Sequence, residues 1–218
     1  MKKKLVIALA LFILLSTYKS PKSLLFTKIN IKEIKIENNF ILNDNEIKKE
    51  LNFLYQTNLF FLKTSSIKKI LKKNEYIESI EIKKIYPNKL KIKIFEKKLI
   101  AVLFHKKKKF YISEDINLIK FSDLKNYRNL PLVFGDRKNF LELYTNLKKI
   151  NFPLDSIDKY YFYESKRWDL ETNKNIRIKL PVKNYNKSLE SYMNLKQVGN
   201  FDKYKIFDYR INNQLILK

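Results

Sequence analysis

Few side chains in this sequence could carry out catalysis or bind a metal ion. The 218 residues include a single histidine, His105, and no cysteine, which excludes disulfides, thiolate metal sites and multi-histidine metal sites. The two glycines, Gly135 and Gly199, lie too far apart for a glycine-rich phosphate-binding loop. Asp155 and Asp158 resemble a carboxylate pair, but no base or electrophile accompanies them in the sequence. We therefore predict no catalytic residue, no metal site, no cofactor and no small-molecule substrate, and we expect that the protein is not an enzyme.

The strong positive charge has a compositional explanation. Lys and Arg total 46 against 22 Asp and Glu, a formal net charge of +24. Forty-one of these cations are lysines, spread along the whole chain, and Ile, Asn, Phe and Tyr are also abundant, as in proteins of AT-rich genomes. A nucleic-acid-binding protein concentrates its charge on one face and favours arginine. We therefore expect no nucleic-acid partner, although such a surface is attracted to anionic lipid headgroups.

The amino-terminal segment has the pattern of a membrane-directing sequence. Three lysines at positions 2–4 precede an apolar stretch that runs from Leu5 through Leu11 and Leu15 to Tyr18. A helix of this length spans roughly 21 Å, which suits either a cleaved signal peptide or a short anchor. No small-x-small cleavage site follows, so an anchor at residues 5–22 with a cytoplasmic tail at 1–4 is favoured. The rest of the chain is then delivered across the membrane.

Residues 29–97 have the pattern of a small α+β domain with the order β-α-α-β-β. Isoleucines from Ile29 to Ile36 indicate a strand. Asn43 is expected to cap one helix and Thr64 a second. The segment 77–86 predicts a strand, and after the turn at 87–89 alternating apolar residues at 90, 92 and 94 predict the strand that returns.

Residues 98–218 are expected to form a strand-rich domain with two helices. The helices are predicted at 138–150 and 186–198. Strands are predicted at 101–104, 110–112, 117–120, 157–163, 168–172, 176–180 and 205–217. The last of these runs almost to the final residue of the sequence, and a strand at a sheet edge exposes N–H and C=O groups that invite a partner strand.

Four motifs follow one another along the chain. The stretch IKKIYPNKLKIKIFE at 82–96 is similar to the segment that closes the POTRA domain of the FtsQ/DivIB family. LPLVFG at 130–135, RWDL at 167–170 with IRIKLP at 176–181, and DYR at 208–210 match later family motifs. The resemblance covers nearly the whole chain and implies a transmembrane helix, a POTRA domain and a carboxyl-terminal β domain.

The resemblance also implies a function and partners. Proteins of this family are non-enzymatic scaffolds of the bacterial division septum, which would place this chain in the inner membrane as a single-pass protein with its bulk in the periplasm. Its partners would be FtsB and FtsL, captured by strand addition at the last strand and linked to septal peptidoglycan synthesis. The implied contact residues are Arg210, Ile211, Asn213, Leu215, Leu217 and Arg167.

Two alternatives stay open at this point. Arg210 could simply pair with Asp208 on the same sheet. The chain could also be a POTRA-bearing component of outer-membrane assembly or secretion. Such proteins continue into many barrel strands, and the sequence after Lys98 contains too few strand patterns of that kind.

Overall fold

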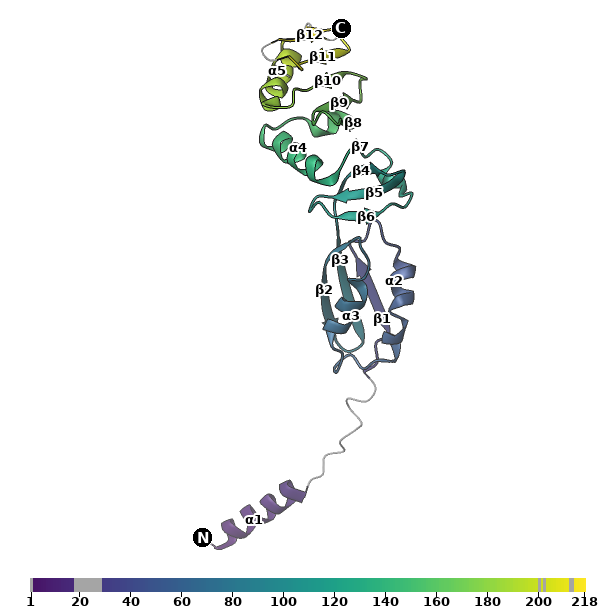
Figure 1. Ribbon diagram of the computed structural model, residues 1–218. Coiled ribbons are helices and arrows are strands. Elements are labelled where there is room, and N and C mark those ends of the chain that lie inside the picture. The colour runs from purple at the N-terminus through teal and green to yellow at the C-terminus, as the bar shows by residue number, and fades with distance from the viewer. Residues whose placement is uncertain (1, 18–28, 200, 202, 212–213) are drawn as a thin grey trace. The chain divides into compact units, whose positions relative to one another are not determined.

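The chain divides into two compact units, one ending at Glu96 and the other beginning at Lys97. The computed structural model describes residues 2–17, 29–199, 201, 203–211 and 214–218 (Figure 1). Helix α1 (Lys2–Thr17) exposes its apolar side chains. Among the described residues, no helix has both the length and the apolar character needed to cross a membrane. The anchor at 5–22 therefore stays a prediction, and positions 18–22 of it lie outside the described residues.

The first unit has the order of elements that its sequence predicts. Its helices pack against a sheet in which β1 pairs parallel with β3 and β3 pairs antiparallel with β2. The core is built from the alternating residues of β3, Leu90, Ile92 and Ile94, all fully buried. The elements are β1 (Glu33–Glu37), α2 (Asp44–Glu50), the 3₁₀ helix η1 (Asn52–Gln56), α3 (Thr64–Leu71), β2 (Ile77–Ile85) and β3 (Lys89–Glu96).

The two predicted helix caps of this unit have different outcomes. Asn43 is the N-cap of α2, and its side-chain oxygen accepts a hydrogen bond from the Asn45 amide at 2.8 Å. The predicted cap at Thr64 is wrong, because Thr64 is the first helical residue of α3 and Lys63, with extended backbone, takes the N-cap position. Helix α3 thus begins one residue earlier than the sequence predicted.

Glu96, the last residue of the POTRA-like motif, holds the loop between β1 and α2. Its carboxylate accepts backbone hydrogen bonds from Phe40 at 2.9 Å and from Ile41 and Leu42 at 2.8 Å. A carboxylate suits this place because it has several lone pairs and bonds amide N–H groups more strongly than a neutral acceptor does.

The described residues of the second unit form one nine-stranded sheet in the order β12-β11-β10-β9-β8-β7-β4-β5-β6. The pairs β4–β7, β7–β8 and β10–β11 are parallel, and the other neighbours are antiparallel. The strands are β4 (Leu99–His105), β5 (Lys108–Ser113), β6 (Leu118–Lys120), β7 (Leu132–Phe134), β8 (Ile157–Phe162), β9 (Trp168–Thr172), β10 (Arg177–Lys179), β11 (Ile206–Asp208) and β12 (Ile216–Leu217).

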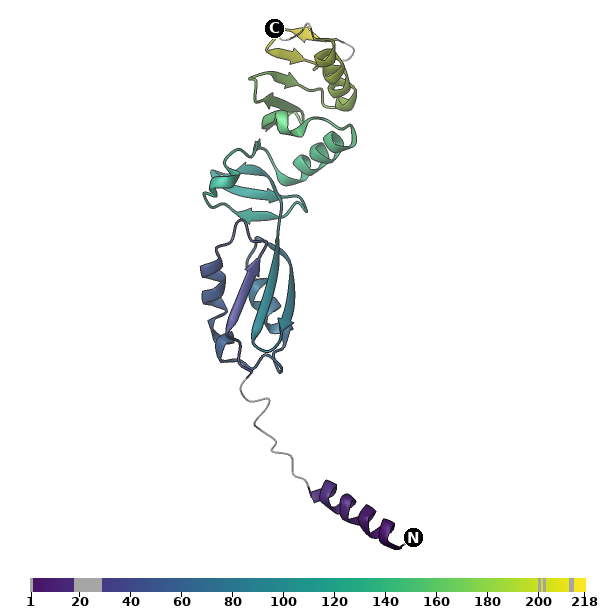
Figure 2. The same ribbon diagram turned by 180° about the vertical axis from the view of Figure 1, so that it is seen from behind.

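Two long helices cover the same face of this sheet (Figures 1 and 2). Helix α4 (Arg137–Lys149) connects β7 to β8, and α5 (Tyr185–Val198) connects β10 to β11. Each therefore serves as the crossover that parallel strands require. Short 3₁₀ helices η2 (Lys125–Tyr127) and η3 (Leu154–Ser156) complete the unit. Under the helices lies one core whose largest fully buried side chains are Phe140, Tyr160 and Phe207.

Gly135 in the LPLVFG motif has a packing role. A Cβ atom built at this position would lie 2.8 Å from the Phe162 Cβ and 3.4 Å from the Trp168 ring. The chain leaving β7 therefore passes so close to β8 and β9 that a side chain there would have to displace them.

Candidate interaction edge of the second sheet

The predicted last strand at 205–217 is a short hairpin rather than one strand. Strand β11 ends at Asp208, and the chain reverses to form β12, which pairs antiparallel with it. Strand β12 is the outermost strand of the sheet order, with β6 at the opposite edge. The prediction of a strand at the sheet edge holds for Ile216 and Leu217, while the described residues between the two strands are irregular.

The main chain of β12 offers hydrogen-bonding groups to a further strand. Ile206 and Lys218 exchange both of their main-chain hydrogen bonds, at 2.9 and 3.1 Å. In an antiparallel ladder such pairs alternate with pairs that exchange none, and Leu217, opposite Phe207, belongs to the second kind. The N–H and C=O of Leu217 therefore point away from β11, toward the place where an added strand would lie.

Arg210 is held beside this edge by Asp208. Its Nε donates to one carboxylate oxygen at 2.8 Å and its Nη2 to the other at 2.7 Å. The hydrogen bonds from Arg210 lower the pKa of the largely buried Asp208 carboxyl. The Arg210 side chain is 48% exposed. The pairing with Asp208 that the sequence allowed is thus present, and about half of the arginine still faces solvent.

Arg167 has a similar place two strands away. It forms an ion pair with Asp169 of β9, and its guanidinium lies 4.1 Å from the centre of the Tyr163 ring. Burial raises the pKa of the Asp169 carboxyl, and the charge of Arg167 opposes that rise. Arg167 therefore compensates an acid that the sheet buries.

The two arginine–aspartate pairs belong to one row across the sheet. Lys179 of β10 lies opposite Asp169 on one side and Asp208 on the other, and Asp208 lies opposite Ile216 of β12. The charge of Asp169 also reaches Arg210, whose pKa it helps to raise after the larger effect of Asp208. The row leads from Asp169 on β9 across β10 and β11 to β12, so Arg210 lies beside the outer strand and Arg167 at the inner end of the row.

The structure divides the other predicted contact residues. Leu215 and Leu217 pack against the core of the unit, so their side chains hold the hairpin in place. Ile211 is exposed, whereas Asn213 lies outside the described residues. Sequence reasoning missed Ile216, which is exposed on the edge strand and could have been found from strand alternation, because residues next to inward-facing ones face outward.

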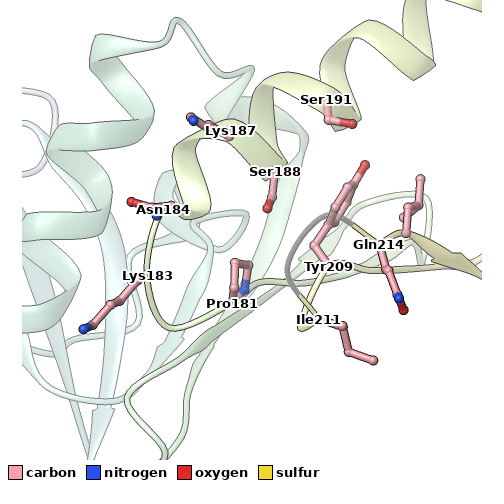
Figure 3. A pocket seen from close by; sticks show the side chains of 10 residues that line it. Pro181, Lys183, Asn184, Lys187, Ser188, Ser191, Tyr209, Ile211 and Gln214 are labelled. Atoms are coloured by element: carbon pink, nitrogen blue, oxygen red, sulfur yellow. The ribbon is translucent and has the colours of Figure 1, made fainter.

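A pocket of about 520 Å³ separates the hairpin from the first turns of α5 (Figure 3). Tyr209 is only 6% exposed, and its hydroxyl makes no hydrogen bond of normal geometry to the described residues. Burial raises the pKa of this phenol, and the neighbouring Ser191 opposes the rise. The pocket is lined by Pro181, Lys183, Asn184, Lys187, Ser188, Ser191, Tyr209, Ile211, Gln214 and Leu215. A partner side chain reaching over the hairpin would meet a polar, lysine-bearing surface here.

The described residues contain no group of three or more His, Asp or Glu side chains placed to hold a metal ion. The arrangement at this edge is instead suited to contact with another polypeptide. It combines outward main-chain groups on β12, an exposed isoleucine and two arginines held by acids.

Comparison with known proteins finds similar cell-division proteins. Residues 29–97 match the POTRA domain of the FtsQ type. The cell division protein FtsQ of Rickettsia felis is 26% identical over 231 residues, which cover all of this chain and 86% of that protein. FtsQ of Rickettsia typhi is 28% identical over 193 residues, covering 86% of this chain and 72% of that protein.

A solved structure is also similar, the major extracytoplasmic domain of the cell division protein DivIB from Geobacillus stearothermophilus. It has 14% sequence identity and a TM-score of 0.33, and the match covers 49% of this chain and 96% of that chain. Both of these relatives are cell-division proteins, which disfavours the outer-membrane assembly alternative. The chain is thus similar over its whole length to an FtsQ cell-division protein, and its residues 29–97 match the FtsQ-type POTRA domain.

Proposed function

We propose that the protein is a non-enzymatic scaffold of the division septum that recruits FtsB and FtsL to the divisome and links them to septal peptidoglycan synthesis. The similarity to FtsQ proteins and the FtsQ-type POTRA match support the division role. The observation that carries the partner assignment is the outward-facing main chain of Leu217 on β12, at the edge of the second sheet.

In this proposal FtsB adds a strand beside β12. The Leu217 N–H and C=O bond its main chain, and Ile216 packs against one of its side chains. FtsL joins through FtsB. Strand β12 is short, so it can form only a few main-chain hydrogen bonds with an added strand. Side chains next to β12 must therefore contribute to affinity as well.

Arg210 and Arg167 are the proposed charged contacts. Each already neutralises an internal aspartate, and Arg210 keeps half of its side chain in solvent. The Arg210 guanidinium has more N–H donors than its bonds to the two carboxylate oxygens of Asp208 use. An acidic side chain of FtsB would accept hydrogen bonds from the remaining donors. Reversal of this charge would therefore repel FtsB as well as break the internal pair.

The proposed topology is a single pass through the inner membrane. Residues 5–22 form the anchor, with Leu5, Leu11 and Leu15 in the bilayer, residues 1–4 in the cytoplasm and both folded units in the periplasm. The lysines before the apolar stretch favour this orientation. Lysines near both ends can extend a short span by placing their charges in the headgroup layer.

The test is capture of the periplasmic segment of FtsB by a fragment comprising residues 29–218. The exposed side chains of α1 belong to neither core, so this fragment keeps both folded units. We expect Leu217→Pro to abolish capture, because proline lacks the outward N–H and fixes φ.

Leu217→Ala is the matched control, since it loses the same core packing but keeps the N–H. The difference between the two variants reports the main-chain contact alone. Arg210→Glu should also weaken capture, by more than tenfold if FtsB uses this charge. Equal capture by folded Leu217→Pro and Leu217→Ala proteins would show that FtsB docks elsewhere.

A further inference from the structure

Three segments of the first unit meet where its chain begins. The Leu59 amide donates to the Ile29 carbonyl at 2.8 Å, and the Ile31 amide donates to the Thr57 carbonyl at 3.2 Å. The Lys32 amide donates to the Asn88 carbonyl at 2.8 Å. The loop between η1 and α3 and the turn between β2 and β3 therefore flank the beginning of the unit, and Figures 1 and 2 show β1 starting at the same end as that turn.

Large aromatic side chains are exposed at this end. Phe60 and Phe61 are 49% and 70% exposed, and their rings meet edge to face at 5.3 Å. Tyr86, in the turn, is 55% exposed. Tyr86 directly follows β2 and comes two residues after Lys84, whose side chain contacts the Phe60 loop. We call Phe60, Phe61 and Tyr86 the aromatic tip.

Cations surround the aromatic tip. The Lys84 ammonium donates to the Phe60 carbonyl at 3.1 Å, which fixes a positive charge beside the two phenylalanines. Lys32 and Lys63 are exposed on the adjoining segments. Glu33, an acid of this end, is paired with Lys89 at 2.6 Å. Exposed aromatic rings among lysines are the pattern of protein surfaces that rest in the headgroup layer of an anionic bilayer.

We propose that the aromatic tip is a lipid-binding site that rests in the headgroup layer of an anionic membrane. The assignment to lipid rather than to a protein rests on charge complementarity and on the length of chain before the tip. Eleven residues, 18–28, separate α1 from the first unit, and such a segment spans at most about 40 Å. If α1 is the membrane anchor of the proposed function, on which this step rests, the bilayer is always within reach of the tip.

The opposite end of the same unit supplies a matched control. Phe40 is 74% exposed, but its amide is bonded to Glu96 at the far end of β3. Strand β3 runs for eight residues from Lys89 to Glu96, a length of roughly 23 Å, and Phe40 lies at the far end of it from the turn that carries Tyr86. Replacing Phe40 or the tip phenylalanines by serine leaves the net charge unchanged, which separates the aromatic contribution from general attraction of a lysine-rich protein.

The test is flotation of fragment 29–218 with vesicles at about 0.15 M salt, where long-range attraction is screened. Vesicles of equal parts phosphatidylcholine and phosphatidylglycerol are compared with phosphatidylcholine alone. We expect the parent fragment and Phe40→Ser to float with the anionic vesicles, and the double variant Phe60→Ser/Phe61→Ser to bind at least about tenfold more weakly. Near-ultraviolet circular dichroism checks that each variant is folded.

A second measurement does not depend on serine variants. In a Phe61→Trp fragment, lipids brominated on the acyl chains should quench the new fluorescence, while the buried Trp168 of the parent is unaffected. Failure of the parent fragment to float, equal flotation of the double serine variant, or absence of quenching would each overturn the proposal, and a protein partner for the tip would then be the explanation. The fragment lacks the anchor and needs no FtsB, so these outcomes leave the proposed topology and recruitment untouched.

Discussion

Replacing Arg210 by alanine should destabilise the second unit even when no partner is bound. The change removes two charge-assisted hydrogen bonds, at 2.8 and 2.7 Å, and leaves the Asp208 carboxylate largely buried with less compensation. Breaking a fully buried ion pair costs about 3–5 kcal/mol. Arg210 is half exposed, so water replaces part of what is lost, and we expect the free energy of unfolding to fall by about 1–3 kcal/mol.

The assay is urea unfolding of fragment 29–218 followed by tryptophan fluorescence. Trp168 is the single tryptophan of the sequence and is buried in β9, so its emission reports on the second unit alone. Asp208→Asn is the control that keeps the shape of the acid and removes its charge. A double variant, Asp208→Asn with Arg210→Ala, should cost less than the two single changes together.

The effect should depend on pH with a defined sign. Arg210 lowers the pKa of Asp208 in the folded state, so the pair stabilises the fold above the pKa of the unfolded carboxyl, about 3.9. This contribution is lost as pH falls through the folded-state pKa of Asp208. The difference between parent and Arg210→Ala should therefore be constant near neutrality and shrink below about pH 4. Equal stability of the two proteins at pH 7 would refute the reasoning and leave Arg210 as a partner contact alone.

Three further changes test particular contacts. Gly135→Ala should destabilise the second unit by about 1–3 kcal/mol, because its Cβ meets the Phe162 Cβ at 2.8 Å; an unchanged urea midpoint by Trp168 fluorescence would show that the strands can separate there. Glu96→Ala should cost the first unit about 1–3 kcal/mol and speed amide exchange at residues 40–42, as measured by NMR, and slow exchange in the variant would argue against the carboxylate's role. Tyr209→Phe should leave the stability unchanged or raise it by up to about 1 kcal/mol, because the hydroxyl is buried without a normal hydrogen bond; a loss of stability in the same urea assay would mean that Ser191 bonds it.

Local patterns predicted the first unit well. The alternation of Leu90, Ile92 and Ile94 is a short-range signal, and all three residues are buried as expected. The insertion of β3 between β1 and β2 could not be predicted in the same way, because it depends on a parallel pairing of Glu33 with Lys89 across more than fifty residues. The cap of α3 was misplaced by one residue, as expected where threonine can serve either as cap or as first helical residue.

In the second unit, short strands set the limit of prediction. Strand β7 has three residues and lies between two parallel neighbours, so neither its length nor its pattern distinguishes it from a loop. The hairpin of β11 and β12 resembles one strand in sequence because both of its ends are rich in strand-favouring residues, although Asp208, Asn212 and Asn213 are of types that strands disfavour. The glycine of LPLVFG is recognisable in the sequence as part of a motif. The reason why a glycine is needed there, the close approach of Phe162, is visible only in the folded sheet.

For the candidate edge, the sequence predicted which part of the chain forms it better than it predicted which side chains are exposed there. Arg210 and its alternative partner Asp208 were both evident from their spacing, and the structure pairs them. Leu215 and Leu217 are predicted as contacts from their place in the last strand, but their side chains pack against the core, and the exposed residue is Ile216. Choosing between two faces of a strand requires knowing which face the helices cover.

Amide hydrogen exchange at Leu217 tests the central claim most directly. In free fragment 29–218, the amides of Ile216 and Lys218 lie in the ladder with β11, whereas the Leu217 amide points outward and should exchange rapidly. When the periplasmic segment of FtsB is added at saturation, strand addition at β12 predicts that the Leu217 amide becomes protected while its two neighbours change little. Continued rapid exchange at Leu217 in the saturated complex would contradict the account and place the FtsB contact on another part of the protein.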